Sequence, residues 1–384
     1  MSGHPAPGRP SRPVRVLFVD HAPALGGAEH SLLLLLECLD RDLVTPSLAC
    51  APGALLARAQ EMGVACHAVA MPQMRGHPLG LVRLWRGAVA LERMARREAA
   101  DVVCANTVRG SLYAAMAAVL ARLPLVWYVR DILAPGLYVR TLERIASAVV
   151  AVSQAAAEPL GGAATVIPNG VRIDAFTANA EASAQMRARW GVPVDAPVVG
   201  MVGRLRPWKG QDHFLRAMRL VADQRPDAWF VLVGGAVFAE REPFLPRLRE
   251  LAAELRLLDR VVFAGQMEDV AAAYAAMDVV VHCSVEPEPF GRVVIEAMAA
   301  SRPVVAYDWG GPHEIVIPGE TGLLVAPGDY GALGEAALAL LRDAGRRRVL
   351  GAAGRARAEE CYDARATARR VQAVLIQAAH GGSR

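Results

Sequence analysis

Residues 279–298 read VVVHCSVEPEPFGRVVIEAM, an apolar β-branched run followed by two prolines, a glycine and a helical pattern. Prolines suit the first turn of a helix and Gly291 allows a close approach of backbone, so we expect the helix to begin near Phe290. The free N–H groups at such a helix start form an anion-binding site. Glu296 falls inside this helix in an apolar context, where an unpaired carboxylate is costly and a pair of ribose hydroxyls would satisfy it.

The same alternation of apolar strands and helices extends over most of the chain. The predicted strands are 14–19, 48–50, 64–67, 101–104, 125–128, 148–152 and 165–167, then 198–202, 229–233, 261–264, 279–283, 303–306 and 323–325. Strands that are apolar on both faces and separated by helices imply parallel sheets covered on both sides. A helical stretch at 174–195 interrupts the pattern and indicates a domain boundary. The sequence therefore predicts an α/β protein of two doubly wound, Rossmann-like domains facing each other across a cleft.

The 384 residues exceed the usual size of one domain. We expect a disordered tail at 1–13 and an N-terminal Rossmann-like domain at 14–180. A C-terminal Rossmann-like domain is expected at 181–360, and a C-terminal helix and tail at 361–384. The C-terminal helix is expected to pack back on the first domain.

Composition limits the class of protein and its location. A net charge of +4 is small for this length, so no nucleic-acid partner is expected. Six cysteines without any C-x-x-C pair are interpreted as buried free thiols, which favours a reducing, cytoplasmic compartment. No apolar stretch reaches the roughly 20 residues that span a bilayer, so any membrane contact is expected to be peripheral, at the inner face of the plasma membrane. The arginine-rich amphipathic segment 81–97 can lie on anionic lipid, and a solvated helix face is the alternative.

Two other loops carry chemistry at predicted strand ends. Gly26 and Gly27 open a helix whose N–H groups can face an anion, although a tight turn explains them equally well. They do not form G-x-G-x-x-G, which argues against a dehydrogenase. Arg204 and Lys209 bracket the loop after strand 198–202, where they can neutralise a diphosphate or act only as solvated cations. The D-x-D sequence at 40–42 follows a helix, and we expect no metal site there.

The paired carboxylates Glu288 and Glu296 also raise the possibility of a glycosidase. Eight residues of helix span about 12 Å, which exceeds the separation of roughly 5 to 9.5 Å that hydrolases use. Because Glu288 is expected to precede the helix, the spacing weakens that interpretation without excluding it.

Taken together, the motifs resemble glycosyltransferase family 4, in the same order over about Val14 to Asp329. The segments that carry the resemblance are Gly26-Gly27-Ala28-Glu29, Ile167-Pro168-Asn169-Gly170-Val171, Gly203-Arg204-Leu205 with Lys209-Gly210, Glu288-Pro289-Phe290-Gly291 with Glu296-Ala297-Met298, and 303–306 through Gly310-Gly311-Pro312-His313-Glu314.

The resemblance implies a catalytic set of Arg204, Lys209 and Glu288. The two cations would hold the donor diphosphate and stabilise charge on the departing nucleotide, so neither a metal nor a cofactor is required. Glu288 would bind hydroxyls of the transferred sugar. No side chain is required as a nucleophile, because a donor phosphate oxygen takes the proton of the acceptor.

The resemblance also implies donor-binding roles for Gly27, Phe290, Gly291 and Glu296. Gly27 would face the diphosphate, Phe290 and Gly291 would offer backbone N–H groups, and Glu296 would bind the ribose. Many relatives carry a His-Asp pair where this chain has Arg130-Asp131. Because arginine cannot exchange a proton at neutral pH, Arg130 is expected to act as a hydrogen-bonding cation for phosphate or sugar.

The implied activity is a retaining, metal-independent transfer from a UDP- or GDP-linked sugar to a glycan, lipid-linked or other glycoconjugate acceptor. The resemblance implies that the domain at 14–180 binds the acceptor and that the domain at 181–360 binds the nucleotide sugar. Surface polysaccharide and glycolipid synthesis are the expected settings. Two alternatives stay open: a nucleotide-sugar 2-epimerase on the same fold, and a non-catalytic subunit that only binds a nucleotide sugar.

Overall fold

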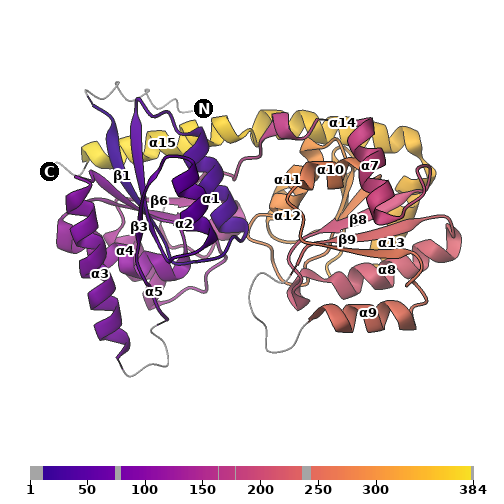
Figure 1. Cartoon of the computed structure of the whole chain (residues 1–384), viewed down its shortest axis with the longest axis horizontal. Coiled ribbons are helices and arrows are strands. Elements are labelled where there is room, and N and C mark those ends of the chain that lie inside the picture. The colour runs from indigo at the N-terminus through magenta and orange to yellow at the C-terminus, as the bar shows by residue number, and fades with distance from the viewer. Residues whose placement is uncertain (1–11, 74–78, 163, 178, 236–243, 382–384) are drawn as a thin grey trace. The chain divides into compact units, whose positions relative to one another are not determined.

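The chain divides into two units (Figure 1). Our computed structural model describes residues 12–73, 79–162, 164–177, 179–235 and 244–381. Unit 1 consists of Met1–Gly170 and Ala364–Arg384, and unit 2 of Val171–Asp363. Most of the tail predicted at 1–13, namely 1–11, lies outside the described residues, as do 382–384 of the predicted C-terminal tail.

The described residues of unit 1 form a seven-stranded parallel sheet in the order β3-β2-β1-β4-β5-β6-β7. The strands are β1 (Val14–Asp20), β2 (Val44–Cys50), β3 (Ala65–Ala68), β4 (Val102–Ala105), β5 (Leu125–Val129), β6 (Ala148–Ala151) and β7 (Thr165–Val166). Strands β1, β4 and β5 are almost wholly buried, as their apolar runs predict. Each predicted strand of this half is confirmed, and β2 begins four residues earlier than expected.

Helices cover both faces of this sheet. Those of unit 1 are α1 (Gly27–Cys38), α2 (Ala54–Glu61), α3 (Gly80–Arg97), α4 (Val108–Ala121), α5 (Leu137–Ile145), α6 (Gln154–Ala157) and α15 (Ala364–Gly381). Helices α3, α4 and α5 pack together on one face, and α15 packs beside α1 on the other. The buried residues Val371 and Leu375 anchor α15, and the Asp40 backbone N–H donates to the Gln372 side chain at 3.0 Å. The expected return of the C-terminal helix to the first unit is confirmed.

Unit 2 repeats the plan with a six-stranded parallel sheet in its described residues, ordered β10-β9-β8-β11-β12-β13. The strands are β8 (Val198–Val202), β9 (Trp229–Val233), β10 (Val261–Gly265), β11 (Val279–His282), β12 (Val304–Tyr307) and β13 (Gly322–Val325). The helices are α7 (Ala180–Trp190), α8 (Gln211–Gln224), α9 (Phe244–Glu254), α10 (Val270–Ala275), α11 (Arg292–Ala299), α12 (Gly311–Ile315), α13 (Tyr330–Arg342) and α14 (Ala344–Cys361). The core between the sheet and α8 is built around Phe214, Phe230 and Leu333.

Both sheets reverse their strand order at one point, between β1 and β4 in unit 1 and between β8 and β11 in unit 2. In doubly wound sheets the carboxyl ends of strands at this switch point open a crevice in which ligands bind. The topology therefore predicts one binding edge in each unit.

All six cysteines are free, but only Cys50, Cys104 and Cys283 are buried. The expectation that all six are buried is wrong for Cys38, Cys66 and Cys361, which are partly exposed. These three lie on or next to surface elements, where one side of the chain faces solvent.

No helix in the described part of the chain is both long enough and apolar enough to cross a membrane.

Candidate functional site

Two loops meet at the switch point of unit 2. After β8 the chain enters a 3₁₀ turn at Pro207–Lys209, and Gly210 then begins α8 with a φ of 76°. A Cβ at Gly210 would lie 2.0 Å from the Cys283 carbonyl oxygen, so only glycine fits this approach. The Val285 N–H donates to the Trp208 carbonyl at 2.8 Å, which joins this loop to the one after β11.

Lys209 and Glu288 form an ion pair across these loops. Their side chains are 13% and 12% exposed, so solvent screens the pair only weakly. The Lys209 ammonium also lies 4.0 Å from the centre of the Trp208 ring. Lys209 is the only lysine of the chain. Its ammonium is more compact and more strongly hydrated than the guanidinium of an arginine, and it lies beside this carboxylate.

Two further side chains contact the same carboxylate oxygen. The Ser284 hydroxyl donates to Glu288 Oε2 at 3.0 Å, and the His282 Nε2 lies 3.4 Å from it. Burial alone would raise the pKa of Glu288, but the Lys209 charge and the His282 contact hold it well below its ordinary value. Glu288 is therefore ionised, and its Oε1 receives no hydrogen bond from the described residues. This oxygen can accept hydrogen bonds from hydroxyl groups of a ligand.

Sequence reasoning missed His282 and Ser284. His282 ends β11 and is 4% exposed, and within the described part of the chain its Nδ1 has no partner. The available signal was a pair of polar side chains at the end of an otherwise apolar strand.

Gly291 precedes α11 with a φ of 95°, a left-handed conformation that favours glycine. The predicted helix therefore exists and begins two residues after Phe290. Phe290 is buried beside Tyr362, with ring centres 6.1 Å apart, so its backbone rather than its ring can face a ligand. The Gly311 N–H donates to the Glu288 carbonyl at 2.8 Å and fixes the loop from its other side.

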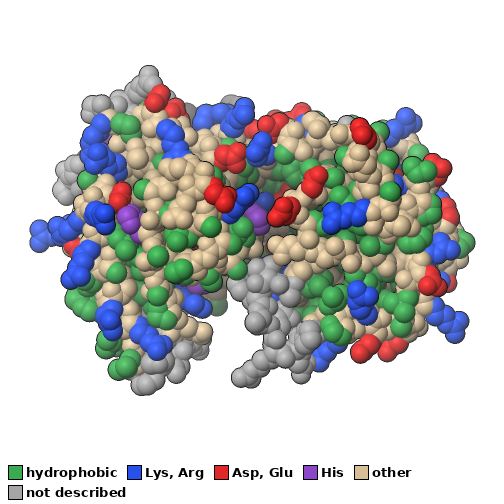
Figure 2. All heavy atoms as spheres, viewed as in Figure 1, with side chains coloured by type: hydrophobic (Ala, Val, Ile, Leu, Met, Phe, Trp, Pro, Cys, Tyr) green, Lys and Arg blue, Asp and Glu red, His purple; other side chains and the backbone are tan. Residues whose placement is uncertain are grey.

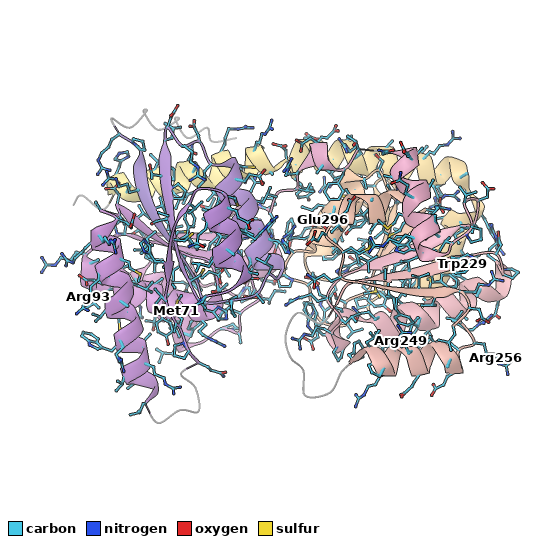
Figure 3. The ribbon with its side chains drawn as sticks, in the orientation of Figure 1. Met71, Arg93, Trp229, Arg249, Arg256 and Glu296 are labelled. Atoms are coloured by element: carbon cyan, nitrogen blue, oxygen red, sulfur yellow. The ribbon has the colours of Figure 1, made fainter. Side chains whose placement is uncertain are left out.

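Glu296 lies on α11 (Figure 3) and has two partners. Arg292 donates to its Oε1 at 2.9 Å, and the Tyr274 hydroxyl donates to its Oε2 at 3.1 Å. The expectation of an unpaired carboxylate is therefore wrong, because an arginine one turn earlier on the same helix satisfies it. Both oxygens keep further acceptor capacity, so the expected ribose contact stays a prediction.

Arg204 follows β8 and is half-buried. Its carbonyl accepts from the Gln211 side chain at 2.8 Å, which fixes the backbone. No described residue pairs with its guanidinium, so this cation is free to meet an anion.

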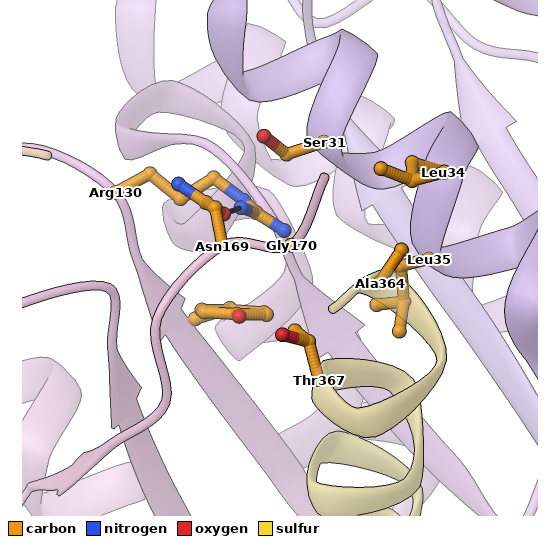
Figure 4. A pocket seen from close by; sticks show the side chains of 9 residues that line it. Ser31, Leu34, Leu35, Arg130, Asn169, Gly170, Ala364 and Thr367 are labelled. Carbon is orange, nitrogen blue, oxygen red and sulfur yellow. Dashed lines mark hydrogen bonds between the residues drawn. The ribbon is translucent and has the colours of Figure 1, made fainter. Parts of the chain in front are cut away.

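A buried polar network marks the switch point of unit 1. Asn106 donates to Asp20 at 2.6 Å and accepts from Arg130 Nε at 2.5 Å, and Arg130 Nη1 donates to Asn169 at 2.6 Å. The Arg130 guanidinium also lies 4.0 Å from the centre of the Tyr128 ring. Figure 4 shows Arg130 and Asn169 lining a small pocket with Ser31 and Thr367. Arg130 is thus held rigidly at this edge, with its Nη2 making no hydrogen bond to a described residue.

Asp20 is fully buried and was not predicted as a site residue. Burial and the nearby Glu29 charge raise its pKa to about 7, against the opposing effects of the Ala22 N–H, Asn106 and Arg130. The Gly26 N–H donates to Glu29 at 2.8 Å, so the helix caps its own start immediately before Gly27. Part of the expected anion-binding N–H set is therefore already used.

The D-x-D sequence at 40–42 lies in a turn after α1. Asp40 accepts from the Asp42 backbone N–H at 3.0 Å, which is a local turn contact. The described residues contain no cluster of three or more His, Cys, Asp or Glu side chains that could bind a metal.

Comparison with known proteins assigns both halves of the chain. Residues 25–175 match the model of Glycosyltransferase Family 4, and residues 183–357 match that of Glycosyl transferases group 1. A GDP-mannose-dependent alpha-(1-6)-phosphatidylinositol monomannoside mannosyltransferase of Mycolicibacterium smegmatis is 36% identical over 49% of this chain and 50% of its own length. The lipopolysaccharide core biosynthesis mannosyltransferase LpsB of Rhizobium meliloti is 34% identical over 61% of this chain and 66% of its own. The chain thus spans about half to two thirds of these curated relatives.

Solved structures agree along nearly the whole chain. Anabaena HepE in complex with UDP-glucose superposes with a TM-score of 0.82 at 30% identity, covering 93% of this chain and 98% of HepE. A glycosyltransferase from Rickettsia africae has a TM-score of 0.85 at 22% identity and supports the fold alone. The two doubly wound parallel sheets are those of the two-domain fold called GT-B. With this fold, the ordered motifs at both switch points and matches over both halves, the chain belongs to glycosyltransferase family 4.

Proposed function

We propose that this protein transfers a hexose from a UDP- or GDP-linked donor to a lipid-linked or glycan acceptor, with retention of anomeric configuration and without a metal ion. The observation that carries the proposal is the buried cluster of Lys209, Glu288, Ser284 and His282 at the switch point of unit 2.

The cations of this edge suit a diphosphate. The guanidinium of Arg204 and the ammonium of Lys209 offer charge-assisted hydrogen bonds to phosphate oxygens, and the start of α11 adds backbone N–H groups. Charge that develops on the leaving nucleotide is then stabilised by groups already in place.

Glu288 and Glu296 provide acceptors for hydroxyl groups. Glu288 is fixed through Oε2, which leaves Oε1 for hydroxyls of the transferred sugar, while Glu296 on α11 receives those of the ribose. Arg130 in unit 1 contributes a hydrogen-bonding cation for phosphate or sugar.

In the proposed step the bond from the anomeric carbon to the phosphate oxygen breaks as the acceptor oxygen bonds to that carbon. The acceptor proton moves to an oxygen of the departing diphosphate. Attack on the face that the nucleotide leaves preserves the alpha configuration. The name of the Mycolicibacterium relative includes alpha-(1-6) and GDP-mannose, which is compatible with the proposed alpha-linked product.

The names of the relatives support a class of acceptor, and the free cysteines support a cellular location. Names that include phosphatidylinositol monomannoside and lipopolysaccharide core favour a lipid-linked acceptor in surface glycoconjugate synthesis. Six free cysteines favour a reducing compartment, so we place the protein in the cytoplasm.

Calorimetric binding of UDP, GDP and ADP, with and without EDTA, tests the donor site. We expect one nucleotide to bind regardless of EDTA, Lys209→Met to weaken binding, and Arg348→Met, on the exposed face of α14, to leave it unchanged. Transfer from UDP-glucose and GDP-mannose, followed by NMR of the anomeric proton, tests retention. Absence of nucleotide binding, its loss in EDTA, or a beta-linked product would contradict the corresponding part of the proposal.

A further inference from the structure

Exposed large hydrophobic side chains gather at one edge of unit 1. Seven occur among its described residues, and six of them lie at the N-terminal ends of α3, α4 and α5. These six are Leu79, Leu81, Val82, Trp85, Val108 and Leu137. Val119, on the C-terminal half of α4, is the exception.

This edge is also the predicted binding edge of the sheet. Helices α4 and α5 follow β4 and β5, so they begin where those strands end. Helix α3 packs along α4 and leads into the start of β4, so its N-terminus lies at the same edge. The apolar side chains therefore share the strand-carboxyl edge with Arg130 and the Gly26-Gly27 turn.

Neighbouring side chains leave much of the surface of these apolar residues open to solvent. Leu81 is 82% exposed, Leu137 81% and Trp85 54%. Contiguous apolar surface rimmed by polar groups marks an interaction site. Leu81 and Trp85 are one turn apart on α3, so they extend from the same face of the helix.

The same exposed face of α3 becomes basic toward its C-terminus. Exposed arginines at 86, 93, 96 and 97 follow the apolar turns on that face, and among them Glu92 pairs with Arg96. In Figure 2, basic and hydrophobic side chains interleave over the region of α3, and Figure 3 shows Arg93 pointing away from the body of unit 1. The 18 residues of α3 extend about 27 Å, long enough to lie along a flat surface.

We infer that α3 docks unit 1 on an anionic lipid surface, with Leu81, Val82 and Trp85 inserted below the phosphates. Tryptophan and leucine suit the boundary between headgroups and acyl chains, and arginines on the same face meet lipid phosphates. A protein partner would have to place acidic side chains opposite Arg86, Arg93 and Arg97, whereas the phosphates of an anionic lipid surface meet all three. The inference deepens the proposed function, because docking at this edge would bring a lipid-linked acceptor to the strand ends.

The test uses the full chain and vesicle co-sedimentation. Vesicles of phosphatidylcholine alone are compared with vesicles that contain phosphatidylglycerol in about a one-to-three ratio to phosphatidylcholine. The wild type is expected to bind only the anionic vesicles and to be released in about 1 M salt. The double variant Leu81→Glu/Trp85→Glu should bind at least about ten-fold more weakly. Arg93→Gln/Arg97→Gln should lose about five-fold for each arginine.

Matched controls separate docking from folding. Val119 is 58% exposed on the same unit, but it lies toward the opposite edge of the sheet. The Val119→Glu variant should therefore bind vesicles like the wild type. Binding should also shift tryptophan fluorescence to the blue, and Trp85→Phe should remove that shift while retaining most of the binding.

Equal binding of the wild type and Leu81→Glu/Trp85→Glu would overturn the inference, as would no binding of the wild type to anionic vesicles. Self-association that only this double variant abolishes, without vesicle binding, would assign the face to a second copy and also overturn it. If vesicle binding fails while UDP or GDP still binds by calorimetry, the docking inference alone fails. If vesicles bind but no nucleotide does, the proposed function fails and the docking inference stands.

Discussion

Replacing Lys209 by methionine removes the ammonium that pairs with Glu288 and keeps a side chain of similar length. In the wild type, burial raises the pKa of Glu288 but Lys209 and His282 lower it further, so the carboxylate stays charged. In Lys209→Met the effect of burial, which raises the pKa of Glu288, is less strongly opposed. The charged carboxylate, which is only 12% exposed, also loses its principal counterion.

The magnitude follows from burial and from the partners that stay. Removing one partner of a buried ion pair costs about 3–5 kcal/mol. Ser284 still donates to Glu288 at 3.0 Å and His282 still contacts it at 3.4 Å, so we expect the lower end, about 3 kcal/mol of unfolding free energy at pH 7. Loss of a group that stabilises developing charge should lower kcat by about 10²–10³-fold.

A double-mutant cycle measures the interaction free energy between Lys209 and Glu288. It compares the urea unfolding of the wild type, Lys209→Met, Glu288→Gln and the double variant. Removing both charges should cost less than the sum of the single changes, by about 2 kcal/mol. A carboxylate with a lowered pKa stabilises the wild type above its unfolded pKa, and that contribution is lost only as pH falls through the folded pKa. In Lys209→Met the pKa rises, so the deficit should be smaller at pH 5 than at pH 7. Additive costs, or a deficit that does not change with pH, would refute the reasoning.

Three further predictions concern single side chains. Because Lys209 is the only lysine, amine acylation should label it and the N-terminal amine, and bound UDP or GDP should slow labelling at Lys209; equal labelling rates would contradict a phosphate contact. Glu296→Gln should weaken nucleotide binding about ten-fold, or about 1.4 kcal/mol, by calorimetry, while the exposed Glu335→Gln leaves it unchanged; equal affinities would sink the ribose contact. Because burial raises the pKa of Asp20 to about 7, the folded state keeps a proton that the unfolded chain loses near pH 4, so stability should fall by up to about 1.4 kcal/mol per unit between pH 4 and 7. Asp20→Asn should flatten that slope in urea unfolding, and an unchanged slope would count against a buried, protonated Asp20.

The sheets were predictable because strands covered on both faces must be apolar along their length. The early start of β2 was missed because Pro46 interrupts that signal. Proline lacks a backbone N–H group, and it is tolerated at this position because β3 pairs with β2 only from Ser47 onward. No residue of β3 therefore lies opposite Pro46 to accept a hydrogen bond from it.

The site was only partly predictable. Lys209 and Glu288 carry recognisable motifs, but their direct pairing joins positions 79 residues apart. Asp20 and Asn106 are 86 residues apart, and each is an ordinary polar residue at the end of a strand until the sheet brings them together. The pairing of Glu296 with Arg292 was available from their spacing on one helix, and the apolar surroundings concealed it.

The return of α15 to unit 1 sets an order of assembly during protein synthesis. A ribosome that has made Gly170 must add the 193 residues of 171–363 before α15 exists, which takes roughly 10–40 s at 5–20 residues per second. Until then the face of unit 1 that α15 covers has no partner from its own unit. The nascent chain thus has an interval in which a chaperone can bind that face, and a stop codon before Ala364 would make the exposure permanent. Truncations in this region should therefore impair accumulation of the protein in cells even though they spare every residue of the proposed donor site.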